Sequence, residues 1–279
     1  MTLTAAASTG YHFVGWSGDT TASGNPLALV MTRDRSVTAS FAINTYALSV
    51  TTTGSGTVAR SPDQPSYNYG TAVTVTATPG TGYGFTGWSG DTASATNPLS
   101  LVITRDRSLT ATFTINSYTL AVTTVGSGSV AKSPDQPNYN YGTAVTVTAT
   151  PGTGYTFTGW SGDTATTTNP LSLVMTRNRS LTATFTVNSY TLTTATVGNG
   201  SVTKNPNQSS YTYGTSVTLT ASPSPNYHFV GWSGDTTTVT NPLTLVMTRN
   251  RTLTATFAIN TYTLAVTTVG SGTVTKNPN

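Results

Sequence analysis

Residues 73–91 read VTVTATPGTGYGFTGWSGD. In the first half, apolar and threonine residues alternate, which is the period of a half-buried β-strand. In the second half, Tyr83, Phe85 and Gly87 share one parity and Trp88 breaks it. We therefore predict a β-bulge at Gly87 that turns Trp88 toward the core. The stretch predicts two strands joined by a Pro-Gly-Thr-Gly turn.

The same stretch recurs along the chain with a period of 72 residues, which identifies an internal repeat. The pentapeptide Gly-Trp-Ser-Gly-Asp begins at Gly15, Gly87, Gly159 and Gly231, and Asn-Pro-Leu and Thr-Arg-Asp/Asn-Arg segments keep the same spacing. No insertion or deletion interrupts the register. The period predicts three full modules at 46–117, 118–189 and 190–261, the C-terminal part of a module at 1–45, and an N-terminal hairpin of a module at 262–279.

Each period contains several further strand signals. Alternation recurs at 109–113 and 118–122, and a Gly-Ser-Gly turn after the latter predicts a hairpin to a short strand at 129–132. Residues 98–103 fit a strand, or one helical turn followed by a strand. We expect an all-β protein: a head-to-tail tandem array of small modules with about six strands each.

Only Asn116 and Ser117 separate the last strand of one module from the first strand of the next. Such a joint is no flexible linker, so consecutive modules should touch and hold a fixed angle. Met1 aligns with Val73, and Asn279 aligns with Asn207. Two explanations fit these ends: a window from a longer array, or a C-terminal hairpin that completes the open N-terminal module of the next copy. The expected partners are therefore neighbouring copies.

The composition excludes several classes of protein. The chain has no cysteine and no glutamate, about a quarter of its residues are threonine, and only 7% are charged. Disulfides and cysteine-bound metals are excluded, and a helix-rich fold is disfavoured. The net charge of +4 is too dilute for nucleic-acid binding. No segment approaches the roughly 18 apolar residues of a membrane span.

The titratable residues do not form a catalytic pattern. His12 and His228 occupy a position that holds Gly84 and Thr156 in the other copies, which favours a strand surface. The aspartate after each Gly-Trp-Ser-Gly could bind calcium, but a turn is favoured because too few carboxylates accompany it. We therefore expect no enzyme, no cofactor and no metal. The Thr-Arg-Asp/Asn-Arg element is interpreted as a solvated turn, with a phosphate or glycan contact as the alternative.

The aromatic residues divide into a predicted core and a predicted contact surface. The core should contain Trp16, Trp88, Trp160, Trp232, Phe13, Phe85, Phe157, Phe229, Phe41, Phe113, Phe185 and Phe257. The alternative for the tryptophans is an exposed platform that stacks on sugars. The loop tyrosines, which we expect to be exposed and available to a partner, are Tyr67, Tyr69, Tyr139, Tyr141, Tyr211 and Tyr213.

Threonine rows on the strands suit a pleated surface whose hydroxyls face water. On a secreted protein, Thr74, Thr76, Thr110 and Thr112 would also be candidate O-glycan acceptors. Sequons of the Asn-x-Ser/Thr type occur at Asn178, Asn199, Asn207 and Asn250, and they lack a counterpart in at least one other copy of the repeat. Attached glycans would help a weakly charged β-protein to stay in solution.

Residues 82–113 resemble the divergent internalin B-repeat-like modules of bacterial surface proteins. The resemblance rests on Gly-Tyr-x-Phe-x-Gly-Trp from Gly82, Asn-Pro-Leu from Asn97 and Leu-x-Ala-x-Phe from Leu109, and every period carries it. It implies tandem modules in long extracellular proteins, used as stalks, spacers or adhesive surfaces, and no catalytic residue. The related internalin B repeats imply an alternative fold, a β-grasp-like module with a short helix.

These observations together predict a structural protein on or outside a bacterial cell. The expected function is a stiff fibre, stalk or filament, in which the chain is a segment of a longer array. The alternative is an adhesin or glycan-binding surface protein, whose contacts would come from the repeated loops that begin near Pro62.

Overall fold

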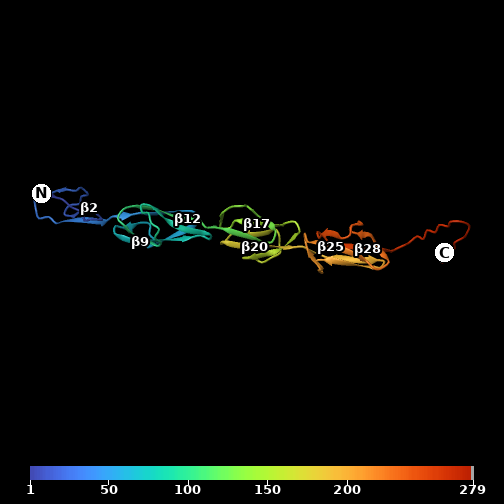
Figure 1. Cartoon of the computed structure of the whole chain (residues 1–279). Helices are drawn as coiled ribbons and strands as arrows, with labels where there is room; N and C mark the ends of the chain where they lie inside the picture. The colour runs from blue at the N-terminus through green and yellow to red at the C-terminus, as the bar shows by residue number, and fades with distance from the viewer. Residues whose placement is uncertain (278–279) are drawn as a thin grey trace. The chain divides into compact units, whose positions relative to one another are not determined.

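The computed structural model describes residues 1–277, which form β-strands and turns (Figure 1). No helix occurs within that range, so the alternative with a short helix is not what the chain adopts. An all-β fold of tandem modules is confirmed. The chain divides into two compact units. The first comprises 1–120, 134–145 and 172–179, and the second comprises 121–133, 146–171 and 180–279.

The second repeat lies in the first unit and shows the complete module. Its strands are β5 (Thr45–Tyr46), β6 (Leu48–Thr53), β7 (Gly56–Ser61), β8 (Tyr67–Asn68), β9 (Thr71–Pro79), β10 (Tyr83–Gly90), β11 (Leu99–Ile103) and β12 (Arg107–Ile115). They form two three-stranded sheets with the orders β10-β12-β6 and β11-β9-β7, and β5 pairs with β8. Residues 99–103 form a strand, without the helical turn of the alternative interpretation.

The core of this module lies between the central strands of the two sheets. Val73 and Val75 of β9 are buried, as are Leu109 and Phe113 of β12, and all four belong to one hydrophobic cluster. The residues between them in the sequence are threonines and alanines, so each strand presents one apolar face. Burial of alternate side chains on two facing sheets explains why the period-2 pattern decides the fold.

The predicted hairpin after the first strand of each module is wrong in its pairing. β6 pairs in parallel with β12, from Leu48 opposite Arg107 to Thr53 opposite Thr112. β7 pairs instead with β9 in the other sheet. The turn at 54–56 therefore forms an arch that carries the chain from one sheet to the other. Alternation identifies the buried face of a strand, but it does not identify the neighbouring strand.

The arch fits around Phe113. Gly54 has a φ of +82°, and a Cβ placed on it would lie 2.0 Å from the Phe113 carbonyl oxygen. A Cβ on Gly56 would lie 2.5 Å from the Phe113 ring. Both glycines are needed because backbone, ring and carbonyl meet without room for a side chain. The arch therefore covers the end of the core.

The predicted bulge is present. The register between β10 and β12 shifts between Phe85 and Gly87. Trp88 then faces the core, and its Nε1–H donates a hydrogen bond of 3.1 Å to the carbonyl oxygen of Thr96. The backbone of Trp88 also pairs with Ser94. The indole is thus buried with its polar atom satisfied.

The second unit repeats this plan in the fourth repeat, where the sheets have the orders β22-β28-β26 and β23-β25-β27. Its strands are β21 (Ser189–Tyr190), β22 (Leu192–Val197), β23 (Gly200–Asn205), β24 (Tyr211–Thr212), β25 (Ser216–Pro223), β26 (Tyr227–Gly234), β27 (Leu243–Val246) and β28 (Arg251–Ile259). The third repeat contributes to both units. Its strands are β13 (Ser117–Tyr118), β14 (Leu120–Val125), β15 (Gly128–Ser133), β16 (Tyr139–Asn140), β17 (Ala144–Pro151), β18 (Tyr155–Gly162), β19 (Leu171–Val174) and β20 (Arg179–Val187).

Residues 1–45 form an open version of the module. Their strands are β1 (Thr2–Leu3), β2 (Tyr11–Gly18), β3 (Leu27–Ala28) and β4 (Val37–Ile43), which make two two-stranded sheets, β1-β3 and β2-β4. The segment has no arch corresponding to β6 and β7. Residues 262–277 carry the arch sequence but form no strand, and residues 278–279 of the expected hairpin lie outside the described range.

Candidate functional site at the joints between repeats

Adjacent repeats meet through one glycine, one asparagine and one tyrosine. At the joint between the second and third repeats, the backbone N–H of Asn116 donates to the carbonyl of Gly82 at 2.8 Å. The N–H of Tyr141 then donates to the carbonyl of Asn116 at 2.8 Å. The linker residue is therefore held by both repeats. β13 and β16 close the joint, since Tyr118 pairs with Tyr139.

The tyrosine ring of this joint lies directly on the glycine. Gly82 has a φ of +77°, and a Cβ on it would approach the Tyr141 ring to 2.2 Å. Both the backbone angle and the close approach require glycine. Tyr141 is half-buried by the contact. The joint thus combines two backbone hydrogen bonds with one ring contact.

The same joint occurs three times, each time inside one compact unit. The residues are Gly10, Asn44 and Tyr69; Gly82, Asn116 and Tyr141; and Gly154, Asn188 and Tyr213. The backbone hydrogen bonds measure 2.8 Å in all three. The fourth repeat has Asn226 in place of the glycine, with a φ of 67°, and asparagine is one of the residues that tolerate this conformation.

Each histidine lies beside the asparagine near the end of its own repeat, and for His12 that asparagine belongs to a joint. His12 Nδ1 is 2.7 Å from Asn44 Oδ1, and His228 Nδ1 is 2.9 Å from Asn260 Oδ1. In the third repeat, the Thr156 hydroxyl donates to the joint asparagine in the same way. A strand-surface position was expected, and the structure adds a hydrogen bond to the joint asparagine. Gly84 of the second repeat has no side chain to make this bond, so the position accommodates His and Thr but does not require the contact.

The six loop tyrosines do not behave alike. Tyr67, Tyr139 and Tyr211 are buried, with 0–1% of their surface exposed, which corrects the expectation that they are exposed. The Tyr67 hydroxyl donates to the Pro62 carbonyl at 3.0 Å and accepts from the Gln64 N–H at 3.3 Å. Because the loop itself satisfies the hydroxyl, the ring can enter the core. The other three, Tyr69, Tyr141 and Tyr213, form the joints.

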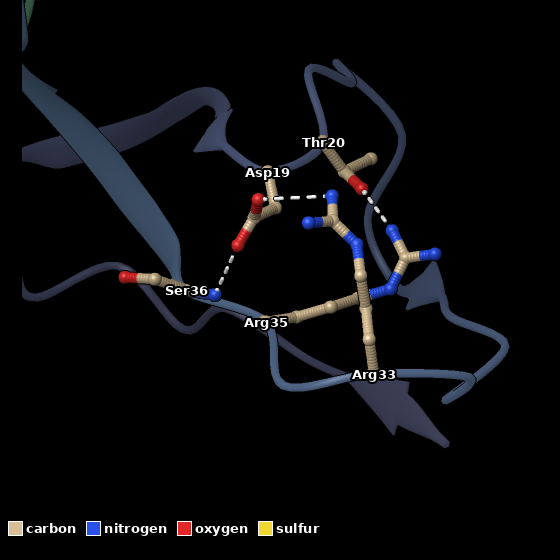
Figure 2. A network of polar contacts seen from close by, with 5 residues as sticks. All are labelled: Asp19, Thr20, Arg33, Arg35 and Ser36. Atoms are coloured by element: carbon tan, nitrogen blue, oxygen red, sulfur yellow. Dashed lines mark hydrogen bonds and ion pairs between the residues drawn. The ribbon is translucent and has the colours of Figure 1, made fainter.

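A second polar cluster joins the aspartate turn to the Thr-Arg-Asp/Asn-Arg turn (Figure 2). Asp19 Oδ2 accepts the backbone N–H of Ser36 at 2.6 Å, and its Oδ1 accepts Arg33 Nη2 at 3.2 Å. Arg35 donates to the Thr20 hydroxyl at 3.3 Å. The other repeats use Asp91 with Ser108, Asp163 with Ser180 and Asp235 with Thr252. The aspartate therefore fixes a turn against the next strand.

The third residue of the Thr-Arg-Asp/Asn-Arg turn accepts a backbone hydrogen bond, which explains why Asp and Asn interchange there. Asp106 Oδ1 accepts the backbone N–H of Ala47 at 2.8 Å. Asn178 Oδ1 accepts the N–H of Thr119, and Asn250 Oδ1 accepts that of Thr191, each at 3.0 Å. The position needs one oxygen acceptor and no charge. The bond ties the start of the arch to the sheet that it joins.

The residues predicted for the core lie at different depths. The four tryptophans have 2–7% of their surface exposed, so their ring faces are not available for stacking on a sugar. Phe113, Phe185 and Phe257 are buried, and Phe13, Phe85, Phe157 and Phe229 are half-buried. Phe41 is 39% exposed. It differs from its counterparts because residues 1–45 lack the arch that covers Phe113.

The candidate O-glycan acceptors Thr74, Thr76, Thr110 and Thr112 are half-buried, because β9 and β12 are central strands with a neighbour on each side. The Thr110 hydroxyl also lies 2.9 Å from that of Thr51. The sequon asparagines at 178, 199, 207 and 250 are exposed. Among residues 1–277, no three histidine or aspartate side chains gather as a metal site would require. That part of the chain also holds no helix that could span a membrane.

Comparison with known proteins agrees with the repeat seen in the sequence. No curated protein matches the chain. Among solved structures, the Bacillus anthracis TIE protein is similar with a TM-score of 0.40 and 8% identity, over 80% of this chain and 55% of that chain. This chain thus spans about half the length of that structure. The family described as the divergent InlB B-repeat domain matches residues 1–45, 46–117, 118–189 and 190–261. Because these matches cover most of the 279 residues, the chain belongs to that family.

Proposed function

We propose that this protein is a structural element of a bacterial surface protein, a stalk or fibre whose joints hold neighbouring modules at a fixed angle. The observation that carries the proposal is the joint at Gly82, Asn116 and Tyr141, with its two backbone hydrogen bonds and its ring contact. The joint recurs with the same distances at the other two boundaries. A repeated lock of this kind suits a spacer, because every added module extends the array without adding a hinge.

The location on or outside the cell is part of the proposal. It is supported by the family to which the chain belongs, because the divergent InlB B-repeat modules resemble those of bacterial surface proteins. The proposed units of the stalk are the modules that the 72-residue period predicts, which begin at residues 46, 118 and 190. The active role of each module is mechanical.

Small-angle X-ray scattering of the 279-residue chain, at a dilution that keeps it monomeric, tests the fixed joints. The variant Y141A/Y213A removes the two rings but leaves their glycines in place. We expect its profile to shift toward that of a flexible chain, while V102A, which alters an exposed side chain of β11, leaves the profile unchanged. A wild-type profile that already fits freely rotating modules would contradict the proposal.

A second candidate function is adhesion. A shallow cavity of about 290 Å³ lies beside Trp232, lined in part by Val230 and by Val239, which is 76% exposed. The third repeat has a cavity beside Trp160, lined by Thr158 and Thr184. Exposed apolar side chains next to threonine hydroxyls suit a carbohydrate surface. Binding of the chain to a glycan array, lost in V239D, would support adhesion. If no glycan binds, only the stalk function remains.

A further inference from the structure

One strand at the edge of the complete module lacks the features that keep sheet edges from pairing with other chains. β6 ends its sheet, because β12 is its only neighbour. Its sequence is LSVTTT, without a charged residue, a proline, a glycine or a bulge. The corresponding strand of the fourth repeat, β22, reads LTTATV. Natural proteins commonly protect their edge strands with such features, because an open edge is a template for another strand.

Other sheet edges of the modules are protected. β10 contains the bulge, and the backbone of its Trp88 pairs with Ser94, which lies outside the sheet. β7 carries a charged residue, Arg60. In the fourth repeat, Arg251 Nη2 donates to the carbonyl oxygen of Val246 on the edge strand β27 at 3.3 Å. β6 differs from these edges because neither a charge nor a bulge lies on it.

Every second residue of β6 directs its backbone N–H and C=O away from β12. In a parallel pair, the backbone groups of one strand alternate between the neighbour and the opposite side. The Arg107 N–H donates to the Ala47 carbonyl at 2.9 Å, so the odd-numbered residues of this segment bond to β12. The backbone groups of Leu48, Val50 and Thr52 therefore point toward the open edge.

Part of this outward row is used within the module. The Leu48 carbonyl accepts a hydrogen bond of 3.1 Å from Arg60 Nη1, which confirms that it points away from β12. The N–H and C=O groups of Val50 and Thr52 have no hydrogen-bond partner among residues 1–277. Four backbone groups on one strand are thus available to a second chain.

A groove lies beside the open edge. Its volume is about 440 Å³, and it is lined by Val50, Thr51, Thr52, Val58 and Arg60. Val50 and Val58 are half-buried, so they give the groove an apolar surface. A strand added to β6 would direct every second side chain to the same side of the sheet as Val50. The groove suits side chains that carry a methyl group, such as threonine and valine.

We propose that β6 pairs antiparallel with β6 of a second copy around a two-fold axis. The pairing sets Val50 opposite Thr52 of the second copy, and Thr51 opposite Thr51 of the second copy. All four available backbone groups of each strand are then hydrogen-bonded, and two three-stranded sheets become one of six strands. Addition of a strand to an open edge is an established mode of recognition. Because a two-fold contact uses the same surface on both copies, the edge needs only to match itself.

The charges favour a second copy as the partner of the second repeat. β6 is uncharged, and Arg60 lies at the Leu48 end of the strand, so the arginines of the two copies lie at opposite ends of the contact. The second repeat has no net charge, because its three arginines are balanced by Asp63, Asp91 and Asp106. The fourth repeat has a net charge of +2, since Asp235 faces three cations, Lys204, Arg249 and Arg251. Two second repeats therefore meet without the repulsion that two fourth repeats would have.

The pairing goes beyond the proposed stalk, because it uses a sheet edge and none of the joint residues. The two proposals can therefore fail separately. A chain with fixed joints that does not pair through β6 would overturn the pairing and leave the stalk. Pairing through β6 by a chain with flexible joints would do the opposite.

The chain has no cysteine, so a single introduced cysteine reports the pairing. Position 51 lies on the proposed axis, where the two Cα atoms of a non-hydrogen-bonded pair are about 4.5 Å apart, a separation that a disulfide spans. Mild oxidation should convert T51C into a reducible dimer of about twice the 28.9 kDa chain mass. The matched control is T53C, on the same exposed face of β6. Its two copies would lie about 13 Å apart along the strands, so T53C should stay monomeric.

Two further variants make the test specific. A mixture of S49C and T53C chains should form the dimer, because Ser49 lies opposite Thr53 of the second copy. T51C/T52P should not, because proline removes one of the outward N–H groups. Proline is tolerated on an edge whose N–H faces solvent, so this variant should still unfold cooperatively in a thermal melt. The proposal is overturned if T51C gives no dimer, if T51C and T53C dimerise equally, or if the dimer survives T52P in the folded chain.

Discussion

The ring of Tyr141 lies so close to Gly82 that a Cβ on the glycine would come within 2.2 Å of it. Gly82 belongs to the second repeat and Tyr141 to the third, so one contact measures how tightly two modules meet. Substitution of the glycine tests that contact without touching either core.

G82A should destabilise the chain through two separate effects. A left-handed backbone costs about 1–2 kcal/mol for an L-residue, and the overlap with Tyr141 adds about 1–3 kcal/mol. The matched control is G142A, because Gly142 has a φ of +83° but open space around it. Urea unfolding followed by fluorescence measures both variants. Equal losses in G82A and G142A would show that the ring contact contributes nothing.

Loss of the carboxylate at Asp91 should matter more than loss of its arginine partner. Asp91 accepts the Ser108 N–H at 2.7 Å, and a hydrogen bond to a charged group contributes about 1.5–3 kcal/mol. The ion pair with Arg105 is exposed and contributes below about 1 kcal/mol. The melting temperature of D91A should therefore be well below that of R105A. The reverse order would mean that the ion pair holds the turn.

Asp106 should tolerate asparagine and not alanine. The side-chain oxygen accepts the Ala47 N–H, and asparagine makes the same bond in the third and fourth repeats. The melting temperature of D106N should equal that of the wild type within experimental error, whereas D106A should lose about 1 kcal/mol of unfolding free energy. If D106N lost as much stability as D106A, the negative charge of Asp106, and not its hydrogen bond, would be what stabilises this position.

Y67F should destabilise the second repeat although it changes one atom. It removes the partner of the Pro62 carbonyl and the Gln64 N–H, and because both residues are exposed and can bind water, the free energy of unfolding should fall by about 0.5–1.5 kcal/mol. Y69F serves as the control, because the hydroxyl of the half-buried Tyr69 has no hydrogen bond among the described residues. Chemical denaturation of both variants decides the point, and an unaffected Y67F would refute the role of the hydroxyl.

Phe113 and Phe41 occupy the same position in two repeats and should respond differently to truncation. F113A empties a buried site, and we expect a loss of about 3–5 kcal/mol. F41A removes a ring that is 39% exposed, so the loss in the dilute monomer should be clearly smaller. Calorimetry at low protein concentration compares them. Equal losses of unfolding free energy in the two variants would mean that the Phe41 ring is buried in solution as deeply as the Phe113 ring.

The sequence alone predicted the repeat, the longer strands of each module and the bulge, because each leaves a local periodic signal, but not the two-residue strands such as β5 and β8. Val73 and Val75 alternate with threonines, and Gly87 interrupts the parity before Trp88. The pairing of β6 with β12 could not be predicted, since its partners lie 59 residues apart and alternation carries no information on strand order.

The short joints were predicted, but the contacts that form them escaped prediction for a related reason. Gly82 was evident as part of a motif, but its need for a positive φ and its contact with Tyr141 depend on a residue of the next repeat. Tyr67 and Tyr69 are two residues apart in one loop, and only the structure separates the buried one from the one at the joint. The signal that could have found the joint glycine is its recurrence at Gly10 and Gly154.

The distance between spin labels in neighbouring repeats tests the fixed joint most directly. Labels at V14C and T86C occupy equivalent exposed positions on β2 and β10, within the first compact unit, and the chain has no other cysteine. Pulsed electron–electron resonance on the dilute monomer should give one narrow distance distribution, which broadens when Y69A is added. A broad distribution in the chain with an intact joint would contradict the account.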